Sequence, residues 1–450
     1  MSSTILTDAV IAKESMAEFH NQISFTKNIN KQYSGEFART GAKIGNTINV
    51  KKANRYVVQQ GPSIVPQGTS ESSVPLTLNR YWTVPLIFSG VERAFSLDKF
   101  RKNYIVPAVT KLASQIDYEC HYAAVNGQYP TANSAGSAAC PGAGAVNFTI
   151  GTPGTVIGTP GGSATGLLQY NAPSCFLNAG LILDNNAAPR DGQRTFQMNA
   201  AGHAQSVGSL TGLFNPQGII SEQYKKGLLG NALDFDFTMD QNTSNFTSGT
   251  ATTANLGNIT ITNNTAAVVA SGTTGTLAAG TTFTVAGYYA VNPENQQNTG
   301  ILAQFVAGVN SRTTDGSWDL SVSGDRTITV SPTPKLTAAT VPDGNIWTST
   351  GAVLGAVAGT ITSGASGTAT PYATNLAFHP DAFTLATADL ELPQSAGGGG
   401  VKYAAREVFD GISMRIVTFW DGMSDSHITR LDVLGGFSVL RPEWAVRISN

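Results

Sequence analysis

The chain has 450 residues, of which only 12% are charged, and it carries a formal net charge of -2. An ordinary soluble domain has roughly 25% charged residues and nucleic-acid binders are basic, so the composition argues against nucleic-acid binding over the whole surface. The 48 glycines, with abundant Thr, Ser, Asn and Ala, favour strands, turns and polar loops. The length allows about three domains.

Cysteine usage and the N-terminus indicate where the chain folds. The cysteines are widely spaced without a C-x-x-C pair, so neither a disulfide scaffold nor a thiolate metal site is expected; they are Cys120, Cys140 and Cys175. The first twenty residues lack the basic segment and long apolar run of a signal peptide. No uncharged apolar stretch reaches the ~18 residues of a membrane span. We therefore expect folding in a reducing cytosol and no membrane partner.

The first predicted element is a helix near the N-terminus. Thr7 or Asp8 is a plausible N-cap. Apolar residues spaced by three and four line one face: Ala9, Ala12, Met16, Phe19 and Ile23. The pattern fits an ordinary packed helix, and an N-terminal arm lying on a neighbouring chain is the alternative.

A strand is predicted within residues 44–58, with Ile48 and Val50 on one face. A polar segment rich in Pro, Gly and Ser follows at 59–73. Such a segment is typical of the tip of an extended arm.

The clearest period-2 pattern follows that tip. Apolar residues occupy the even positions of 74–88, and only Arg80 breaks the set. Pro75 and Pro85 exclude a central position in a sheet because each removes a backbone donor. The pattern predicts a long two-stranded arm with an exposed edge, which needs support from elsewhere, such as another chain.

A long helix is predicted next, from an N-cap at Ser96, with Asp98 in its first turn, to Gly127. Pro107 should kink or delay it. Its apolar face consists of Val109, Leu112, Ile116, Cys120 and Ala123. The Gly-rich loop at 130–166 contains no Lys, so it is not a phosphate-binding loop.

Residues 167–240 have a mixed pattern. We interpret 172–186 as a strand entering a turn and 202–214 as a short helix. The segment 215–241 is interpreted as a helix, a Gly turn and a strand. The region therefore combines helices with strands.

The composition changes sharply between residues 241 and 380. Short alternating runs separated by Gly, Asn and Thr turns predict an inserted all-β module there. The segment 352–374 is interpreted as a linker back to the main fold. Only eight charged residues occur in the region: Glu294, Arg312, Asp315, Asp319, Asp325, Arg326, Lys335 and Asp343.

The last part of the chain is predicted to contain a helix at 379–390, with Asp381 near its start, and then strands. Gly435-Gly436 would allow a turn or a close approach, and Pro442 would mark a break before the last strand. The alternating apolar residues of the C-terminal strands are Leu431, Val433, Phe437, Val439, Trp444, Val446 and Ile448. The fold class is α+β.

No pattern of residues supports catalysis. Cys120 and His121 read as a buried cysteine and a histidine on a helix surface. The loop 420–427 contains turn formers instead of a calcium or acid–base site; they include Asp421, Asp425 and His427. There is no G-x-S-x-G elbow, and five scattered histidines suggest no triad. We expect no catalytic, cofactor-binding or metal-binding residues, no cofactor and no enzymatic activity.

The sequence resembles the major coat proteins of short-tailed bacteriophages of the P-twenty-two kind. The resemblance covers both ends and most of the centre, and is weakest at 128–166 and 241–370. It is carried by "TDAVIAKESM", "YSGEFARTGAKIGNTINVKKANRYVV", "SVPLTLNRYWTVPLIFSGVERAFSLDKFRKNYIVPAVTKLASQID", "LFNPQGIISEQYKKGLLGNALDFDF", "NLAFHPDAFTLATADLELP" and "GISMRIVTFWDGMSDSHITRLDVLGGFSVLRPEWAVRIS".

The resemblance implies the Hong Kong-phage capsid fold with an inserted β-barrel or immunoglobulin-like domain. Some relatives in that fold crosslink a Lys with an Asn, but the arm tip contains no Lys, although Lys51 and Lys52 lie on its stem, so we expect non-covalent assembly. The implied parts are an N-terminal arm (1–43), an extended E-loop (44–90), a peripheral domain with the spine helix and Gly-rich loop (91–166), a first axial part (167–242), the inserted domain (243–345) and a linker followed by axial and peripheral strands (346–450).

The implied function is that of a major capsid protein of a tailed bacteriophage, which self-assembles into an icosahedral head around double-stranded DNA. Implied partners are other copies in pentamers and hexamers, a scaffolding protein, a portal protein, a cement or decoration protein and weakly bound DNA. The location would be the virion, assembled in the bacterial cytoplasm. The alternatives are a secreted or surface adhesin with an immunoglobulin-like module and a hydrolase with a β-accessory domain.

Overall fold

The computed structural model describes part of the chain. The described residues are 8–31, 47–52, 56, 58, 73–89, 104–127, 129, 148–150, 174–210, 230–247, 258–261, 263–271, 275–312, 317–322, 327–336, 344–348, 356–357, 361–363, 371–393, 401–421, 423 and 426–449. The chain divides into two compact units. Unit 1 comprises 1–49, 75–120 and 384–438, and unit 2 comprises 50–74, 121–383 and 439–450.

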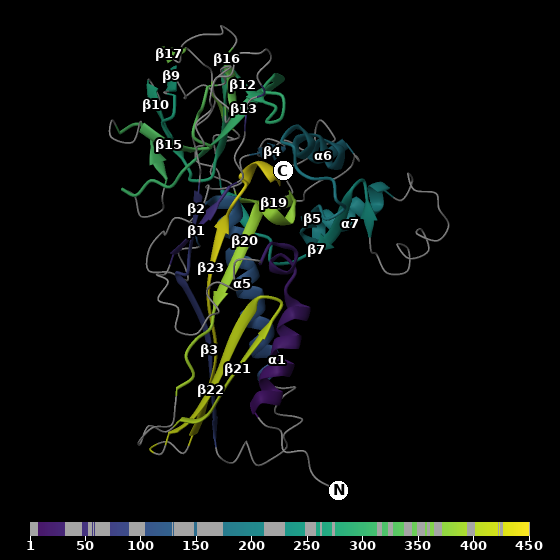
Figure 1. Ribbon diagram of the computed structural model, residues 1–450, viewed down its shortest axis with the longest axis vertical. Helices are drawn as coiled ribbons and strands as arrows, with labels where there is room; N and C mark the ends of the chain where they lie inside the picture. The colour runs from purple at the N-terminus through teal and green to yellow at the C-terminus, as the bar shows by residue number, and fades with distance from the viewer. Residues whose placement is uncertain are drawn as a thin grey trace. The chain divides into compact units, whose positions relative to one another are not determined.

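Unit 1 is built on an antiparallel sheet with long strands. Its strand order is β20-β23-β22-β21, and β3 pairs with β23. The bounds are β3 Arg80–Ser89, β20 Phe383–Ala388, β21 Val401–Phe409, β22 Ile412–Asp421 and β23 Ser426–Val439. Helix α1 (Asp8–Gln22) lies along β21 and β22, and a short 3-10 helix, η1 (Thr26–Asn28), follows it (Figure 1).

A two-residue turn joins β21 to β22. Asp410 and Gly411 have φ values of 50° and 73°, and they lie between the register partners Phe409 and Ile412. Two central residues with positive φ define the type I′ turn, whose twist matches that of the flanking strands. The Asp-Gly pair therefore fixes the register of this hairpin.

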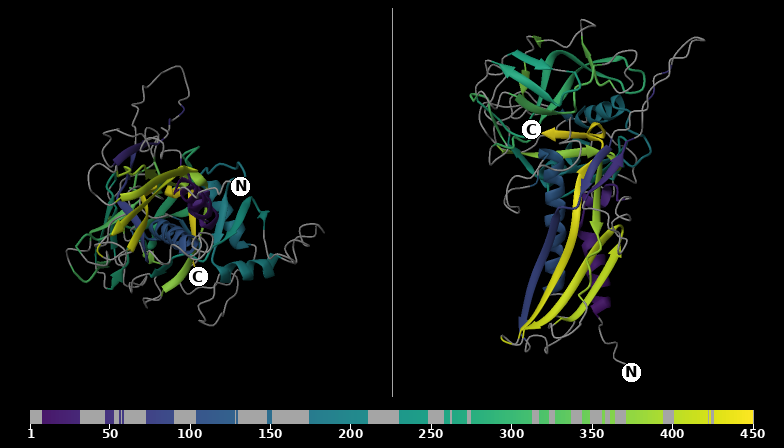
Figure 2. Two further views of the ribbon diagram at one scale, coloured as in Figure 1. Left: turned by 90° about the horizontal axis from the view of Figure 1, so that it is seen from below. Right: turned by 60° about the vertical axis from the view of Figure 1, so that its left-hand side comes forward.

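Strand β3 confirms the predicted alternation and edge position. Arg80 and Trp82 are buried, while Tyr81 and Ile87 are exposed. The one described partner of β3 is β23, so Pro85 lies in an edge strand (Figure 2, right). The predicted arm is interrupted after β2 (Ser73–Thr77), which pairs with β1 (Thr47–Lys51) instead of continuing into β3. The predicted tip at 59–72 lies outside the described residues.

The predicted long helix is confirmed as α5 (Val106–Asn126). It begins directly before Pro107 and ends at Gly127, whose φ of 68° is the left-handed conformation that glycine adopts most easily. The predicted N-cap Ser96 lies outside the described residues. All members of the predicted apolar face are buried: Val109, Leu112, Ile116, Cys120 and Ala123.

The C-terminal strands are confirmed, and the Gly-Gly pair marks a close approach without a turn. Strand β23 runs through Gly435 and Gly436 without interruption. A Cβ added at Gly436 would lie 2.0 Å from the carbonyl oxygen of Thr77, which only glycine avoids. The predicted break is the 3-10 helix η7 (Pro442–Trp444), and β24 (Ala445–Ser449) follows it.

The main sheet of unit 2 has the order β4-β24-β19-β5-β7-β6, and β8 pairs with β19. Helix α6 (Ser174–Asn185) covers one face with Phe176, Ala179 and Leu183. The strand expected at 172–186 is therefore wrong, because its apolar residues recur with helical spacing. Helix α7 (Ala200–Leu210) confirms the short helix. The remaining bounds are β4 Phe148–Ile150, β5 Thr195–Met198, β6 Asn231–Ala232, β7 Phe235–Met239, β8 Asn245–Thr247 and β19 Pro371–Phe378.

The helix expected at 379–390 is also wrong. His379 caps a single 3-10 turn, η6 (Pro380–Ala382), by accepting a bond from the backbone N–H of Asp381, and β20 begins at Phe383. The strand is buried at nearly every position, so its sequence lacks the alternation that identifies a half-exposed strand.

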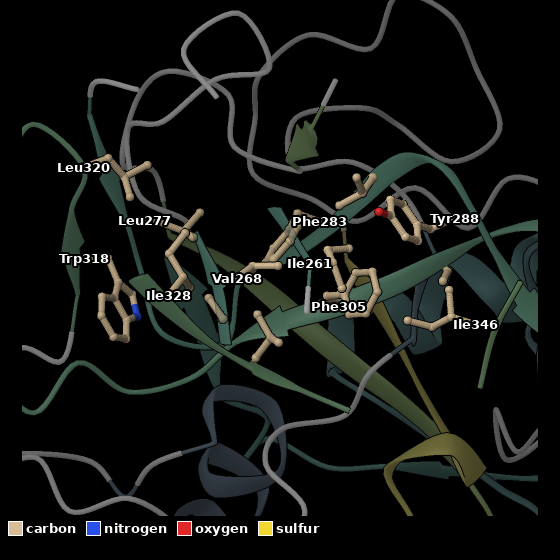
Figure 3. Close-up of a cluster of buried hydrophobic side chains, with 14 residues drawn as sticks. Ile261, Val268, Leu277, Phe283, Tyr288, Phe305, Trp318, Leu320, Ile328 and Ile346 are labelled. Carbon is tan, nitrogen blue, oxygen red and sulfur yellow. The ribbon is translucent and has the colours of Figure 1, made fainter. Parts of the chain in front are cut away.

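A second sheet of unit 2 has the order β16-β12-β13-β15-β10-β9-β17, and β18 also pairs with β12. Strand β17 is at one end of this order, and β18 pairs with β12 near the other end. Only three residues separate β17 from β18 along the chain, so the two ends of the sheet lie within roughly 14 Å of each other. The sheet is therefore curled around its core (Figure 3). The bounds of its strands are β9 Asn258–Ile261, β10 Ala267–Ser271, β12 Thr282–Val291, β13 Asn298–Ala307, β15 Thr327–Ser331, β16 Ile346–Thr348, β17 Ala356–Val357 and β18 Ile361–Ser363. Strands β11 (Thr276–Leu277) and β14 (Trp318–Asp319) form a separate two-stranded sheet.

The linker expected at 352–374 is wrong in part. It contains β17 and β18, which pair with β9 and β12 of the curled sheet, and the start of β19. Three of the short alternating runs expected within 241–380 form β9, β12 and β15, so the prediction of strands there is confirmed. Helices occur together with sheets whose strand pairs are mostly antiparallel, with the parallel pairs β4–β24 and β5–β7 as exceptions, which confirms the α+β class.

Candidate assembly surfaces

The segment after α1 is fixed to α5 by one buried carboxylate. Asp117 Oδ2 accepts bonds from the backbone nitrogens of Ser24 (2.5 Å) and Phe25 (3.2 Å). Its Oδ1 accepts bonds from the backbone nitrogen of Thr26 (3.1 Å) and from the Thr26 hydroxyl. These amides open the 3-10 helix η1, where a negative charge is favourable. Asp117 therefore holds residues 24–26 in place.

The same N-terminal segment is attached to the β21–β22 turn. His20 Nε2 lies 3.2 Å from Asp410 Oδ2, and Lys31 also pairs with Asp410. Burial acts to raise the pKa of Asp410, but the bonds from Lys31 and His20 outweigh it and hold the pKa below its usual value. Met16 and Phe19 are buried. In the described residues, α1 is thus an ordinary packed helix on its own unit.

A row of charged side chains crosses the sheet of unit 1. Register partners place Arg406, Arg415, Asp432 and Thr83 side by side on four neighbouring strands. Asp432 is fully buried and accepts bonds from Arg415 Nη2 (2.6 Å) and from Arg430 Nε (2.9 Å). This network joins β22 and β23 to β3 on the face opposite Trp82 and Val433.

The other face carries a second buried acid. Glu119 of α5 accepts a bond from Trp82 Nε1 at 3.1 Å and one from Gln115 Nε2 at 2.9 Å. Arg80 Nε lies 3.9 Å from Glu119 Oε2. Arg80, the exception in the apolar pattern, therefore lies beside a carboxylate of the long helix.

One end of the same sheet exposes large apolar side chains. Ile87 is 68% exposed, and its register partners across the sheet are Ile428 and then Phe419. Ile428 and Phe419 are half-buried on the face of Ile87. Trp420, which follows Phe419 and faces the other side of the sheet, is 49% exposed, and Met423 is 99% exposed. We call these five residues the apolar end. Large exposed apolar patches mark interaction sites, and aromatic residues with Met are enriched in protein interfaces.

No family model matches the chain, and no curated protein matches it. Similar solved structures include one described as Mycobacterium phage Che8, at 13% identity and a TM-score of 0.43, covering 95% of this chain and 90% of that one. The capsid of Ralstonia phage GP4 is 8% identical, with a TM-score of 0.42 and coverage of 94% and 92%. The capsid of cyanophage P-SCSP1u is 10% identical, with a TM-score of 0.39 and coverage of 90% and 83%. All three TM-scores are below 0.5.

The described residues considered as catalytic or metal-binding candidates are buried or form turn contacts. Cys120 is buried and forms no disulfide. His121 was expected on a helix surface, but it is fully buried, and its Nδ1 accepts a bond from the backbone nitrogen of Ser244 at 3.1 Å. Burial lowers the pKa of His121 to about 3. Asp421 accepts a bond from the Met423 nitrogen (3.1 Å), as a turn former does. Asp425 and the side chain of His427 lie outside the described part.

Among the described residues, no group of three or more His, Cys, Asp or Glu side chains could hold a metal ion. No helix in the described part is long and apolar enough to cross a membrane. The buried acids Asp117, Glu119 and Asp432 were not singled out from the sequence. Their only signal was a charged residue within or beside an apolar pattern, since their partners lie far away in the chain.

Proposed function

We propose that this chain is the major capsid protein of a tailed bacteriophage of the P-twenty-two kind. It is a structural protein and not an enzyme, and it forms an icosahedral head from pentamers and hexamers around double-stranded DNA. The proposal rests on the sequence resemblance and on one structural observation: at one end of the sheet of unit 1, large apolar side chains are exposed, Ile87 on the edge strand β3 and Trp420 on β22. An isolated subunit gains nothing from exposing such residues, whereas a shell subunit buries them against a neighbour.

The proposal assigns the Hong Kong-phage capsid fold to the chain. The curled sheet of unit 2 corresponds to the inserted β-barrel domain, helix α5 to the spine helix and the β1–β2 hairpin to the stem of the E-loop. Many copies close into a shell because heterologous contacts repeat with a fixed rotation. Scaffolding, portal and cement proteins are proposed partners, and contact with packaged DNA is weak and non-specific, as the net charge of -2 suggests.

Electron microscopy of the expressed chain, alone and with a co-expressed scaffolding protein, tests the proposal. Uniform closed shells support it. A stable monomer under both conditions, which binds glycans or converts a substrate, refutes it in favour of an adhesin or a hydrolase.

A point variant tests the apolar end. Ile87→Asp places a charge on an exposed position of β3, so the subunit should fold while the yield of shells falls by at least tenfold. Val269→Asp is the matched control, because Val269 is also an exposed strand residue, 46% exposed on β10. Normal shells from Ile87→Asp would show that the apolar end is not a subunit contact.

Removal of the arm tip tests the E-loop assignment. Deletion of the whole segment 44–90 is unsuitable because it removes β3 from the sheet of unit 1. Replacement of residues 53–72 by a short turn keeps β1 and β2 and should give soluble, folded subunits that make no shells. Normal particles from this variant would contradict the assignment.

A further inference from the structure

His379 is a buried histidine at a junction of three segments of unit 2. Its Nε2 atom lies 3.2 Å from Asp191 Oδ2, in the loop after α6. Its ring meets the ring of Trp444 in η7 edge-on, with the two centroids 5.5 Å apart, and its backbone N–H donates to the Trp444 carbonyl at 3.0 Å. The side chain itself is only 4% exposed. A titratable ring is therefore buried where the loop after α6, η6 and η7 meet.

The hydrogen bonds of this ring fit the neutral imidazole. Nδ1 of His379 accepts a bond from the backbone nitrogen of Asp381 at 3.3 Å, and this bond caps η6. A nitrogen that accepts carries no proton, so the proton of the neutral ring is on Nε2 and is donated to Asp191. A second proton, on Nδ1, would point at the Asp381 N–H and break the cap.

Two carboxylates beside the ring favour a positive charge on it. Asp381 Oδ2 lies 3.9 Å from Nδ1 of His379, so this carboxylate can replace the backbone N–H as the partner of a protonated Nδ1. Burial acts to raise the pKa of Asp191, but the bonds from the Gln193 N–H and from His379 outweigh it and hold the pKa below its usual value. Asp191 is therefore charged between pH 5 and 8. The cap bond and the carboxylates thus act on the ring in opposite directions.

The other charged residues of the segments packed against the ring have partners of their own. In the loop after α6 and directly after it, Arg190 and Arg194 both donate to Asp184. In η7 and directly before it, the charged residues are Glu443 and Arg441, whose guanidinium lies 4.1 Å from the centroid of the tryptophan ring. The charge on the histidine ring therefore depends mainly on its cap bond and its two carboxylates.

Helix η6 stands beside two points where the chain passes between the units. The chain enters unit 1 after Phe383 and leaves it before Val439. The carbonyl oxygen of Ala382, the last residue of η6, accepts bonds from the backbone nitrogens of Leu440 at 2.9 Å and Arg441 at 3.1 Å. The capped η6 therefore bonds the segment that leads into unit 1 to the segment that returns from it.

We propose that His379 is a pH-sensitive latch that holds these two segments together. The neutral ring caps η6 and keeps the Ala382 carbonyl in place for the backbone nitrogens of residues 440 and 441. When Nδ1 takes up a proton, the Asp381 N–H loses its acceptor, the ring pairs with the Asp381 carboxylate, and η6 opens. Histidine side chains change charge between pH 5 and 8. Mild acid therefore loosens the chain at both points without unfolding either unit.

Hydrogen exchange of the full chain at about pH 8 and about pH 5.5 tests the latch. Relative to the intrinsic rate, the amides of Asp381, Leu440 and Arg441 should exchange about fivefold faster at the lower pH, the size expected for loss of a cap. His379→Asn should show no such rise, because Asn is a good N-cap and takes up no proton. His203→Asn, in α7, is the matched control and should respond as the wild type does. An equal rise in His379→Asn, or none in the wild type, would overturn the proposal.

Nitrogen NMR of the protein labelled with 15N in its five histidines observes the ring directly. The His379 signals are those that disappear in His379→Asn or shift in Asp191→Asn. We expect the Nε2–H tautomer at the higher pH and the doubly protonated ring at the lower pH, with the same midpoint as the change in exchange. Asp191→Asn keeps an acceptor for Nε2 but removes a negative charge, so the midpoint should move to lower pH. A ring with the same charge at both pH values would overturn the proposal, whether or not the chain forms shells.

Discussion

Replacement of Asp432 by Asn should destabilise the protein by about 3 kcal/mol. The carboxylate is fully buried and accepts bonds from Arg415 and Arg430. Loss of one partner of a buried ion pair costs about 3–5 kcal/mol because the remaining charge is left uncompensated. The Arg430 side chain is 34% exposed and that of Arg415 is 16% exposed, so both can regain some hydration. We therefore expect the lower end of the range.

The assay is thermal unfolding of the expressed chain at pH 7. A loss of about 3 kcal/mol corresponds to a fall in Tm of roughly 6–12 °C. Asp410→Asn is the matched control, since its carboxylate is 44% exposed and an exposed ion pair contributes about 0–1 kcal/mol. Asn also tolerates the positive φ of that turn. A fall in Tm for Asp432→Asn no larger than that for Asp410→Asn would refute the reasoning.

The same network gives stability a definite dependence on pH. Burial acts to raise the pKa of Asp432, but the bonds from Arg415, Thr83 and Arg430 outweigh it and hold the pKa below its usual value. The unfolded state therefore binds the proton first as the pH falls. The stabilisation is present above the usual pKa of an Asp carboxyl and is lost as the pH falls through the folded-state value. Asp432→Asn should lack this acid-induced loss.

Three other predictions follow from named contacts. Gly436→Ala should destabilise the protein by about 1–3 kcal/mol in chemical denaturation, because the added Cβ would lie 2.0 Å from the carbonyl oxygen of Thr77. Gly180→Ala is the control and should not destabilise the protein, because Gly180 lies in a helix and its added Cβ would have its nearest contact at 3.8 Å. Equal effects of the two substitutions would contradict the close contact at Gly436. Between pH 7 and pH 5 the wild-type protein should lose about 2 kcal/mol more of its free energy of unfolding than His121→Asn. The reason is that the pKa of His121 is about 3 in the folded state and near 6.5 in the unfolded state, so only the unfolded state binds the proton. Parallel profiles of stability against pH for the two proteins would contradict this prediction. Removal of residues 440–450 deletes β24 and with it the buried Val446 and Ile448, so the truncated chain should not fold and circular dichroism should show this loss. A cooperative thermal transition of the truncated chain, like that of the wild type, would contradict the prediction.

Elements whose apolar residues recur with a clear strand or helix period could be predicted from the sequence. The alternation of β3 and β23 and the apolar stripe of α5 each record a face that is buried and a face that is not. Strand β20 was misassigned because it is buried almost throughout and therefore lacks alternation. Helix α6 was misassigned because only three buried residues, Phe176, Ala179 and Leu183, mark its helical spacing. A short apolar run fits either structure until its packing partners are known.

The polar contacts of α5 explain why the candidate surfaces were not predicted. Asp117, Glu119 and His121 alternate along one helix, and all three are buried. Each binds a different segment: Asp117 the turn at residues 24–26, Glu119 the strand residue Trp82, and His121 the backbone of Ser244. The apolar stripe shows only that one face of the helix is covered. The partners of these three polar side chains lie 37 to 123 residues away along the chain, so no local sequence pattern predicts that they are buried. A charged residue beside an apolar stripe can therefore face solvent or bind a segment that is distant in the sequence, and its burial in the structure distinguishes the two cases.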